Sequence, residues 1–503
     1  MTYPRYVPKA IAALAACMLV ACSAPVVAPP ADAPSSSSRM NFDASRYQTQ
    51  QLVVDGQAFT VRAFENIVYV AQPVDTAYQA MNIYVPEAYF HGQAVGKFNA
   101  QTAPIFLPNQ IGGYMPAKPG TPTGRMGPPG ESARASTIAV ALSQGFVVAS
   151  PGARGRTTAT GKAPAAIVDL KAAVRYLRYN DQRMPGDAEK IISNGTSAGG
   201  AMSALLGASG NSPDYAPALA ALGAADVRDD IFAVSAYCPI TNLEHADSAY
   251  EWLFNGVNDY KKIEISMLDF NVQRKEVAGN LAADQISLSG ELKALFPSYL
   301  NSLALRGPQG QALVLDSAGN GSFKEYIRSL VIASAQTALN EGKDLSGLAW
   351  LSVQNGVVMG LDWDGYVRYA GRMKLPPAFD ALDLGSGENQ LFGTATVDKQ
   401  HFTDFSTQRN TASGASQADT HTVKMVNAMA YIGAPKSHTA GYWRIRHGTK
   451  DRDTSLAVPA MLATSLQNRG YAVDFALPWD RPHSGDYDLT ELFAWMTRIS
   501  TAP

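Results

Sequence analysis

The 503-residue sequence predicts an α/β fold, in which a mainly parallel sheet is flanked by helices and interrupted by one large, mostly helical insertion. Two observations carry this prediction. Short apolar runs bounded by Gly and Pro alternate with amphipathic stretches at helical spacing, which is typical of a parallel sheet covered by helices on both faces. The alternation stops near residue 238 and resumes near residue 429.

The first 38 residues differ in kind from the rest. Arg5 and Lys9 precede the apolar run AIAALAACMLVA, which is too short to span a bilayer and is typical of a signal peptide, here residues 1–21. The run ends in LVAC, which resembles a bacterial lipobox and implies cleavage before Cys22 and lipid attachment to its sulfur. The alternative is ordinary secretion with cleavage near the same place. Residues 22–38 are rich in Pro, Ala and Ser and predict a tether, so we expect an exported cell-envelope lipoprotein anchored to a membrane.

Composition narrows the class of protein. Apolar residues make up 46% of the chain and charged residues 17%, as in a globular protein with a large core. The formal net charge of -2 gives no reason to expect a nucleic acid partner. Cys238 would be the one thiol left after cleavage and acylation, which excludes an internal disulfide and predicts a small buried apolar side chain. The oligomeric state is left open, with a monomer favoured.

The first part of the predicted core covers residues 39–237. The runs QAFTVRAF, NIVYVAQP and QAMNIYVPEAY are rich in β-formers and predict an antiparallel lead-in to the sheet. The runs APIFLPNQ and GFVVASPG predict buried strands, and EKIIS predicts a strand that leads into a turn. Between them, AAIVDLKAAVRYLRYND predicts an amphipathic helix, because apolar residues recur at helical spacing with charges opposite.

The predicted insertion covers residues 238–428 and contains helical stretches such as DQISLSGELKALF and SFKEYIRSLVIASAQTAL. An insertion of this size is expected to lie over the functional site as a lid. Residues 429–503 return to the α/β pattern. They predict the strand YWRIRH, the helix SLAVPAMLATSLQNRG, the strand YAVDFALP and the closing helix DLTELFAWMTRI.

The motif GTSAG, residues 195–199, matches G-x-S-x-G with a strand before it and a segment of small residues after it. The turn from strand to helix is so sharp that side chains beside the serine would collide with backbone, which explains the glycines. This context predicts Ser197 as a nucleophile exposed above the sheet edge, at the positive end of a helix.

A serine nucleophile needs a base, and the base needs an orienting acid. In α/β-hydrolases these residues follow the serine in the order acid, histidine. Of the seven histidines, His483 alone lies between the final strand and the final helix, so we predict it as the base. The others precede the serine, lie in or near the insertion, or stand before or beside the acid loop: His91, His245, His401, His421, His438 and His447.

Two aspartates follow the strand YWRIRH within HGTKDRDTS. The spacing H-G-x-x-D resembles the acid loop of many α/β-hydrolases and predicts that Asp451 orients His483. Asp453 then has no role from spacing alone. One interpretation makes it an N-cap of the next helix, since Asp is favoured at that position.

Two backbone N–H groups are expected to form an oxyanion hole. Ala198, directly after the nucleophile, supplies one. The second is expected from Gly112 or Gly113, where a side chain would crowd a substrate. This chemistry requires no metal ion and no organic cofactor.

Three segments resemble the bacterial tannases (tannin acylhydrolases): GTSAGGAMSALLGASGNSPDY, WRIRHGTKDRDTS and RPHSGDYDL. The resemblance covers most of the mature chain, the insertion included. It implies an α/β-hydrolase fold with a lid. It also implies a serine esterase that hydrolyses galloyl esters of tannins to gallic acid and an alcohol, with protocatechuoyl esters left open as a second substrate class.

The resemblance also implies specific residues. The family's catalytic triad falls on Ser197, Asp451 and His483, the assignment already reached from motif and order. In that family a lysine, a glutamate and a second aspartate bind the phenolic hydroxyls of the galloyl ring. Here these galloyl-binding residues fall on Lys374 in GRMKLPP, Glu388 in GSGENQLFG, and Asp453. Without the resemblance, the lysine and the glutamate would be read as ordinary solvated charges.

One departure separates branches of this family. Fungal tannases and feruloyl esterases resemble each other in placing cysteines beside the nucleophile and the histidine, whereas this chain has Thr196 and Ser484 there.

The nearest alternative is an exported feruloyl or general carboxylic ester hydrolase. A serine peptidase is disfavoured because no propeller-like repeats precede the core. A binding lipoprotein on an inactive hydrolase fold is disfavoured because all three triad residues are present.

Overall fold

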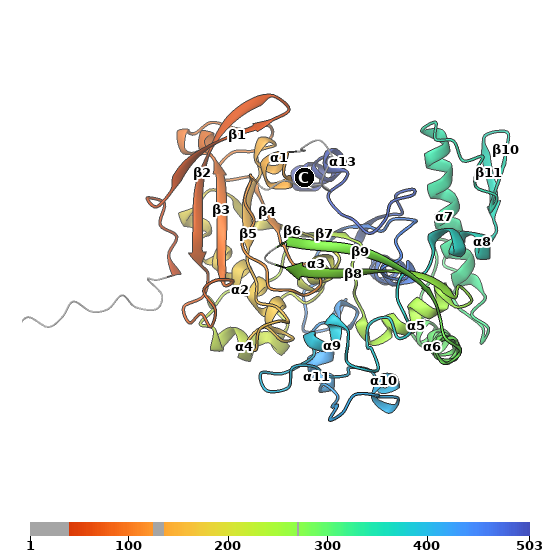
Figure 1. The fold of residues 1–503 in the computed structure, drawn as a ribbon. Coiled ribbons are helices and arrows are strands. Elements are labelled where there is room, and N and C mark those ends of the chain that lie inside the picture. Colours follow the sequence, from red (N-terminus) through yellow and green to blue (C-terminus); the bar gives the residue numbers. More distant parts are fainter. Residues whose placement is uncertain (1–39, 124–134, 269–270, 503) are drawn as a thin grey trace, which may run out of the picture.

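The structure is a computed structural model that describes residues 40–123, 135–268 and 271–502 (Figure 1). The predicted signal peptide, the lipidation site Cys22 and the tether lie outside these residues. A nine-stranded sheet forms the centre, in the order β1-β2-β3-β5-β4-β6-β7-β12-β13. Its strands are β1 Gln48–Val54, β2 Gln57–Val68, β3 Ala80–Pro86, β4 Pro104–Pro108, β5 Val147–Pro151, β6 Asp187–Thr196, β7 Ala233–Tyr237, β12 Tyr442–Arg446 and β13 Ala472–Ala476.

The sheet combines an antiparallel edge with a parallel remainder. β1, β2, β3 and β5 pair antiparallel in sequence, whereas β5, β4, β6, β7, β12 and β13 pair parallel. The α/β prediction is confirmed, as is the antiparallel lead-in. Two details differ. β1 was not predicted, and the runs QAFTVRAF and NIVYVAQP join into one strand, β2, with a register irregularity between Phe64 and Ile67.

Helices cover both faces of the sheet. α1 and α13 contact each other on one face, and α2 and α3 pack on the other (Figure 1). The predicted apolar stripe of α2 is buried, with its members 0–1% exposed: Ile167, Leu170, Val174 and Leu177. The helices of the core are α1 Thr137–Ser143, α2 Ala165–Tyr179, α3 Ala198–Ala208, α4 Ala216–Ala221, α12 Ala457–Gln467 and α13 Leu489–Thr501, with 3-10 turns η2 Glu87–His91, η3 Asp181–Arg183 and η4 Pro213–Tyr215.

β7 and β12 are neighbours in the sheet, although a long segment separates them in sequence. Its helices are α5 Leu243–Phe254, α6 Ala283–Ser302, α7 Ser322–Asn340, α8 Trp363–Ala370, α9 Gly387–Leu391, α10 Asp404–Gln408 and α11 Thr420–Lys424, followed by η5 Ala428–Ala430. α6 and α7 match the two predicted helical stretches. We refer to the segment between β7 and β12 as the lid.

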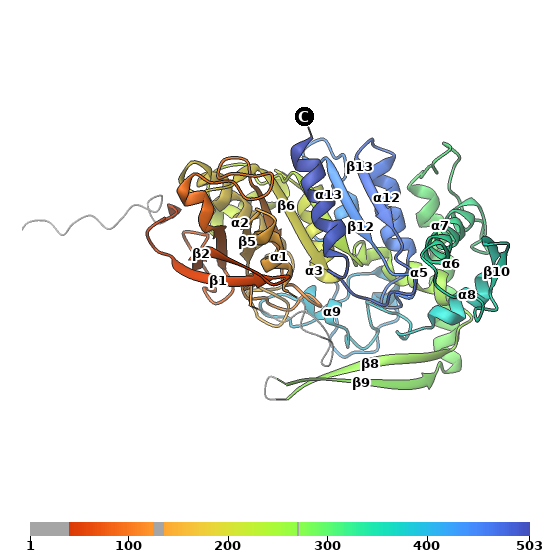
Figure 2. The same ribbon diagram turned by 90° about the horizontal axis from the view of Figure 1, so that it is seen from above.

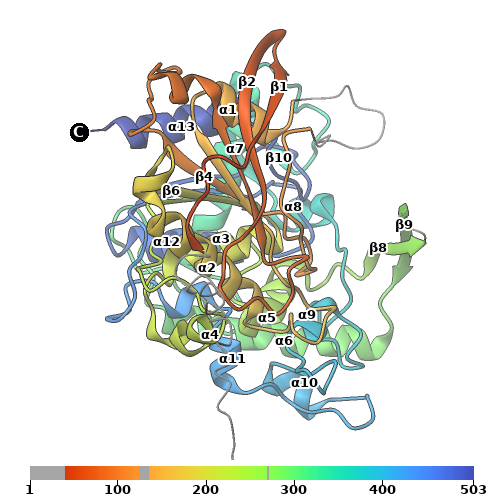
Figure 3. The same ribbon diagram turned by 90° about the vertical axis from the view of Figure 1, so that its left-hand side faces the viewer.

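The lid also contains two hairpins that its sequence did not predict, β8 Asp259–Leu268 with β9 Asn271–Asn280 and β10 Leu351–Gln354 with β11 Val357–Leu361. The first hairpin stands out from the body of the protein (Figures 2 and 3). Among the described residues, no helix combines the length and apolarity needed to cross a membrane.

Candidate active site

Ser197 stands at the sharp turn between β6 and α3. Its backbone has φ 62° and ψ -124°, a conformation that costs free energy for a residue with a side chain and is typical of nucleophile turns. A Cβ on Gly195 would collide with the carbonyl oxygen of Gly199, and a Cβ on Gly199 would lie 2.6 Å from Asn109 Oδ1. The Ser197 N–H donates to the carbonyl of Tyr237 at 2.9 Å and ties the turn to β7.

His483 and Asp451 form a pair at the ends of neighbouring strands. His483 follows β13, Asp451 follows β12, and His483 Nδ1 lies 2.8 Å from Asp451 Oδ2. The Asp451 side chain is fully buried. Burial disfavours its charge, but the imidazoles of His483 and His447 outweigh burial and hold the pKa of Asp451 well below its ordinary value. Burial likewise disfavours the His483 cation, yet Asp451 raises the pKa of His483 well above its ordinary value.

The loop that carries His483 lies against the nucleophile turn. Gly485 approaches Thr196 so closely that a Cβ would overlap the threonine hydroxyl. In the part of the chain that the structure describes, no hydrogen bond joins the Ser197 hydroxyl to His483. His483 Nε2, the nitrogen that would serve as base, instead lies 3.5 Å from Asp453 Oδ2. Catalytic hydrogen bonds often tighten only when substrate binds.

Asp453 links the triad to the lid. Its Oδ1 lies 3.4 Å from Lys374 Nζ, and its Oδ2 is the oxygen that approaches His483. The N-cap interpretation of Asp453 is wrong, because α12 begins at Ala457, its N-cap position is Leu456, and the Ala457 N–H donates to the Ser455 hydroxyl at 3.3 Å. The Asp453 N–H donates to Asp451 Oδ1 at 2.9 Å, which fixes the two aspartates relative to each other.

Glu388 lies in the short helix α9 and is partly buried. Burial raises the pKa of Glu388, Asp453 adds to this, and the cations of Lys374 and Arg156 oppose it. Lys374 and Asp453 therefore form a pair beside His483, and Glu388 lies within range of the charges of both. Two acids and two cations so close together offer both donors and acceptors to a polar ligand.

The predicted oxyanion loop folds as a tight turn. The Met115 N–H donates to the Gly112 carbonyl at 2.9 Å, and Gly113 and Tyr114 both have positive φ, at 53° and 57°. Arg156 Nε donates to the Gly113 carbonyl at 2.7 Å. Gly112 and Gly113 are exposed, and among the described residues neither N–H has a hydrogen-bond partner. Both amides remain candidates for the second oxyanion donor, beside that of Ala198.

Cys238 is buried as predicted, and its thiol also makes polar contacts beside the site. Its Sγ lies 3.4 Å from the Ser484 carbonyl, and burial, followed by the charge of Asp451, raises the pKa of Cys238 to about 11. The ligating atoms of Cys238, Asp451 and His483 lie within 4.8 Å of one another. A thiol, an imidazole and a carboxylate suit a borderline divalent metal ion such as Zn²⁺, although a metal there would occupy the groups predicted as base and acid.

Sequence reasoning missed three further residues of the site. Cys238 and Arg156 occupy strand-end loops with no motif around them. His447 was placed only beside the acid loop. It is buried, and its Nδ1 lies 3.6 Å from Asp451 Oδ2. Burial lowers the pKa of His447 below its ordinary value. Its position four residues before Asp451 is the one signal that pointed to it.

Comparisons with known proteins identify the family. The family model described as BD-FAE matches residues 129–283. No curated protein matches the chain. Among solved structures, tannase from Lactobacillus plantarum is 48% identical with a TM-score of 0.89, and the match covers 93% of this chain and 100% of that one.

Two further structures are similar over the same span. Fusobacterium nucleatum tannase is 51% identical with a TM-score of 0.86, covering 92% of this chain and 99% of that one. A tannin acyl hydrolase in complex with ethyl gallate is 49% identical with a TM-score of 0.87, covering 93% and 100%. Identity of this level over nearly the whole of both chains establishes that this chain belongs to the bacterial tannase family of α/β-hydrolases.

Proposed function

We propose that the protein hydrolyses galloyl esters of tannins to gallic acid and an alcohol through an acyl-enzyme on Ser197. The observation that carries this proposal is the position of Asp453, which lies between the base and a lid lysine: 3.5 Å from His483 Nε2 and 3.4 Å from Lys374 Nζ. A general esterase has no need of charged groups at that point. The related tannin acyl hydrolase was solved with ethyl gallate and with 3,4-dihydroxybenzoate, which supports the same acyl class here.

The reaction begins with attack of the Ser197 hydroxyl on the ester carbonyl while His483 takes the proton. Asp451, 2.8 Å from Nδ1, accepts the Nδ1 proton, which leaves Nε2 as the basic nitrogen, and it stabilises the resulting cation. The amide of Ala198 and that of Gly112 or Gly113 stabilise the oxyanion, with each donor contributing about 3–4 kcal/mol. His483 returns the proton to the leaving alcohol, and water then releases the acid by the same steps.

Recognition of the acyl group falls to Lys374, Glu388 and Asp453. Three adjacent phenolic hydroxyls act as donors and acceptors, and two carboxylates with one ammonium group satisfy both roles. Because the site places these charges at a partly buried position, a ring without hydroxyls would leave them unpaired. Sites of this kind reject the analogue that lacks the hydroxyl by about 10⁴–10⁵-fold in favourable cases.

The direct experiment compares hydrolysis of methyl gallate, methyl ferulate and methyl benzoate by the purified protein. We expect rapid turnover of the gallate and almost none of the benzoate. Similar turnover of all three esters, or preference for the ferulate, would contradict the galloyl assignment and would favour a feruloyl or general esterase.

The LVAC motif, followed by a Pro-, Ala- and Ser-rich segment, supports a second part of the proposal. We propose that the mature protein begins at Cys22, carries lipid on that cysteine and is held at a bacterial membrane by the tether. Labelling of expressing cells with a fatty acid analogue should tag the wild-type protein but not Cys22→Ala. Equal labelling of both, or labelling of neither, would contradict the anchor and favour ordinary secretion.

A further inference from the structure

The buried face of α5 carries three polar side chains one helical turn apart, Asp247, Tyr250 and Glu251. Residues spaced three and four positions apart share one face of a helix. All three are buried, with at most 3% of any residue exposed. Burial of polar groups costs free energy unless each finds a partner, so their partners show what this face is built to hold.

The Tyr250 hydroxyl joins the two segments that carry Lys374 and Asp453. It donates to the carbonyl of Arg452, the residue before Asp453, at 3.0 Å. It accepts from the N–H groups of Met373 at 3.0 Å and of Lys374 itself at 2.9 Å. One hydroxyl therefore fixes the backbone of the lid lysine relative to the backbone of the triad loop.

Glu251 strengthens the same junction. It forms a buried ion pair with Arg372, in which Nη1 lies 2.8 Å from Oε1, and the side chains of both residues are inaccessible to solvent. Arg372 Nη1 also donates to the carbonyl of Lys374 at 3.1 Å. The Lys374 peptide is thus held from both sides by groups that belong to, or pair with, α5.

Asp247 extends the support towards Glu388. Its carboxylate accepts the N–H groups of Phe379 at 2.7 Å and Asp380 at 3.1 Å. The ring of Phe379 lies below the lysine, with Lys374 Nζ 3.9 Å from the ring centre, close enough for a cation–π contact. Asp247 therefore positions both the ring under Lys374 and the backbone of Asp380.

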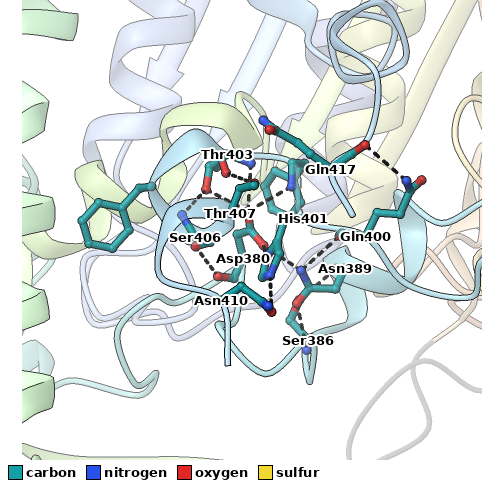
Figure 4. A network of polar contacts seen from close by, with 12 residues as sticks. Asp380, Ser386, Asn389, Gln400, His401, Thr403, Ser406, Thr407, Asn410 and Gln417 are labelled. Atoms are coloured by element: carbon teal, nitrogen blue, oxygen red, sulfur yellow. Dashed lines mark hydrogen bonds and ion pairs between the residues drawn. The ribbon is translucent and has the colours of Figure 1, made fainter. Parts of the chain in front are cut away.

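Asp380 is the hub of a buried polar network (Figure 4). Its carboxylate accepts the Asn389 side-chain amide at 2.7 Å, pairs with His401 Nδ1 at 2.7 Å, and accepts the N–H of Thr403 at 2.8 Å. Asn389 directly follows Glu388 in α9, which has five residues and is too short to persist without tertiary contacts. The Asn389 side chain is the contact that ties α9, and Glu388 with it, to Asp380.

We propose that Tyr250 and Asn389 are positioning residues that hold Lys374 and Glu388 in register with Asp453 on the common support of α5, and that they thereby set the acyl specificity of the site. This inference rests on the proposed galloyl function. Neither residue is expected to touch substrate. Displacement of a recognition group by about 1 Å can reduce rate about 10²-fold, so small losses of register are expected to matter.

The test uses Tyr250→Phe and Asn389→Ala in the full protein, with methyl gallate as the substrate and 4-nitrophenyl acetate as a reporter of the triad. The acetate has no ring on its acyl group, so its rate of hydrolysis depends on Ser197 and His483 and not on ring recognition. The matched controls are Tyr69→Phe and Asn180→Ala. Each removes a fully buried side-chain partner of backbone groups outside the lid, those of Gly152 and of Met40 and Phe42.

We expect both variants to lose about 10–100-fold in kcat/KM for methyl gallate, mainly through KM, while kcat/KM for the acetate stays at the wild-type level. The controls should change neither. In a Lys374→Met background, Tyr250→Phe should have little further effect, because it acts through the lysine. This double-mutant comparison of Tyr250→Phe with Lys374→Met remains informative even if Asn389→Ala fails to fold.

Three results would overturn the inference: an unchanged preference for gallate in folded Tyr250→Phe, equal losses on both esters, or a full additional loss in the Lys374→Met background. A wild-type protein without preference for methyl gallate over methyl benzoate would overturn the proposed function, and this inference with it. The wild-type comparison therefore separates the two failures.

Discussion

The core and the lid fix their functional residues in different ways. In the core, Ser197 follows β6, Asp451 follows β12 and His483 follows β13, so the ladder of the parallel sheet sets their relative positions. In the lid, Lys374 lies outside any helix or strand and Glu388 occupies a five-residue helix. Their positions depend on individual side-chain contacts. On the proposed assignment, the sheet positions the catalytic residues, whereas the recognition residues of the lid depend on side-chain contacts. Asp453, in the loop after β12, lies where the two regions meet.

The largest effect is expected from a substitution that removes the chemistry alone. Ser197→Ala should lower kcat for methyl gallate by about 10⁴–10⁶-fold, since loss of a serine nucleophile disables the whole triad. The variant should still bind gallate and unfold at the wild-type temperature, because the lid is untouched. Steady-state kinetics and thermal denaturation test this, and turnover at the wild-type level would remove Ser197 from the mechanism.

The next effect removes recognition alone. Lys374→Met and Glu388→Gln should each raise KM for methyl gallate and lower kcat/KM by about 10²-fold, while hydrolysis of 4-nitrophenyl acetate persists. The controls are Lys343→Met and Glu341→Gln, which change exposed charges elsewhere in the lid. Equal losses on both substrates would show that these residues support the triad rather than the acyl ring, and would break the division between core and lid.

The same division explains what sequence reasoning could predict. The spacing of apolar residues along the sequence predicts the strands and helices of the core. Motif and chain order predict Ser197, Asp451 and His483 as the triad. Lys374 and Glu388 came only from family resemblance, because a charge in an irregular segment looks the same whether it binds substrate or water. The β8–β9 hairpin was missed, and the Asp380 network was not anticipated, since its partners are scattered over many positions of the lid.

A smaller effect concerns the point where lid and core meet. The charge of Asp453 contributes to the raised pKa of His483, after burial and the dominant effect of Asp451. The base works only when neutral, so activity falls as pH drops through that pKa. Asp453→Asn should lower the pKa of His483 and move the acidic limb of the kcat/KM profile to lower pH. A limb that stays in place would show that Asp453 does not act on the base.

The smallest effect concerns stability of the lid support. Burial, followed by the charge of Asp380, raises the pKa of Asp247 from 3.8 to about 7, and Glu251 adds to this. Between about pH 4 and pH 7 the folded protein therefore keeps a proton that the unfolded chain has already released, so this contribution to stability falls across that range and is absent above about pH 7.

Asp247→Asn cannot titrate, so its free energy of unfolding should gain on that of the wild type as pH rises from 5 to 8, by at most about 1.4 kcal/mol per pH unit. Urea denaturation across this range measures the difference. Asp284→Asn, at an exposed position, is the control. Parallel curves for wild type and Asp247→Asn would contradict the raised pKa.

The separation of chemistry from recognition is tested most directly by calorimetric titration of gallate into Ser197→Ala and into the double variant Lys374→Met, Glu388→Gln. We expect wild-type affinity for gallate in Ser197→Ala and no measurable binding in the double variant. Undiminished binding of gallate by the double variant would contradict this separation, because the lid residues would then have no part in binding the acyl ring.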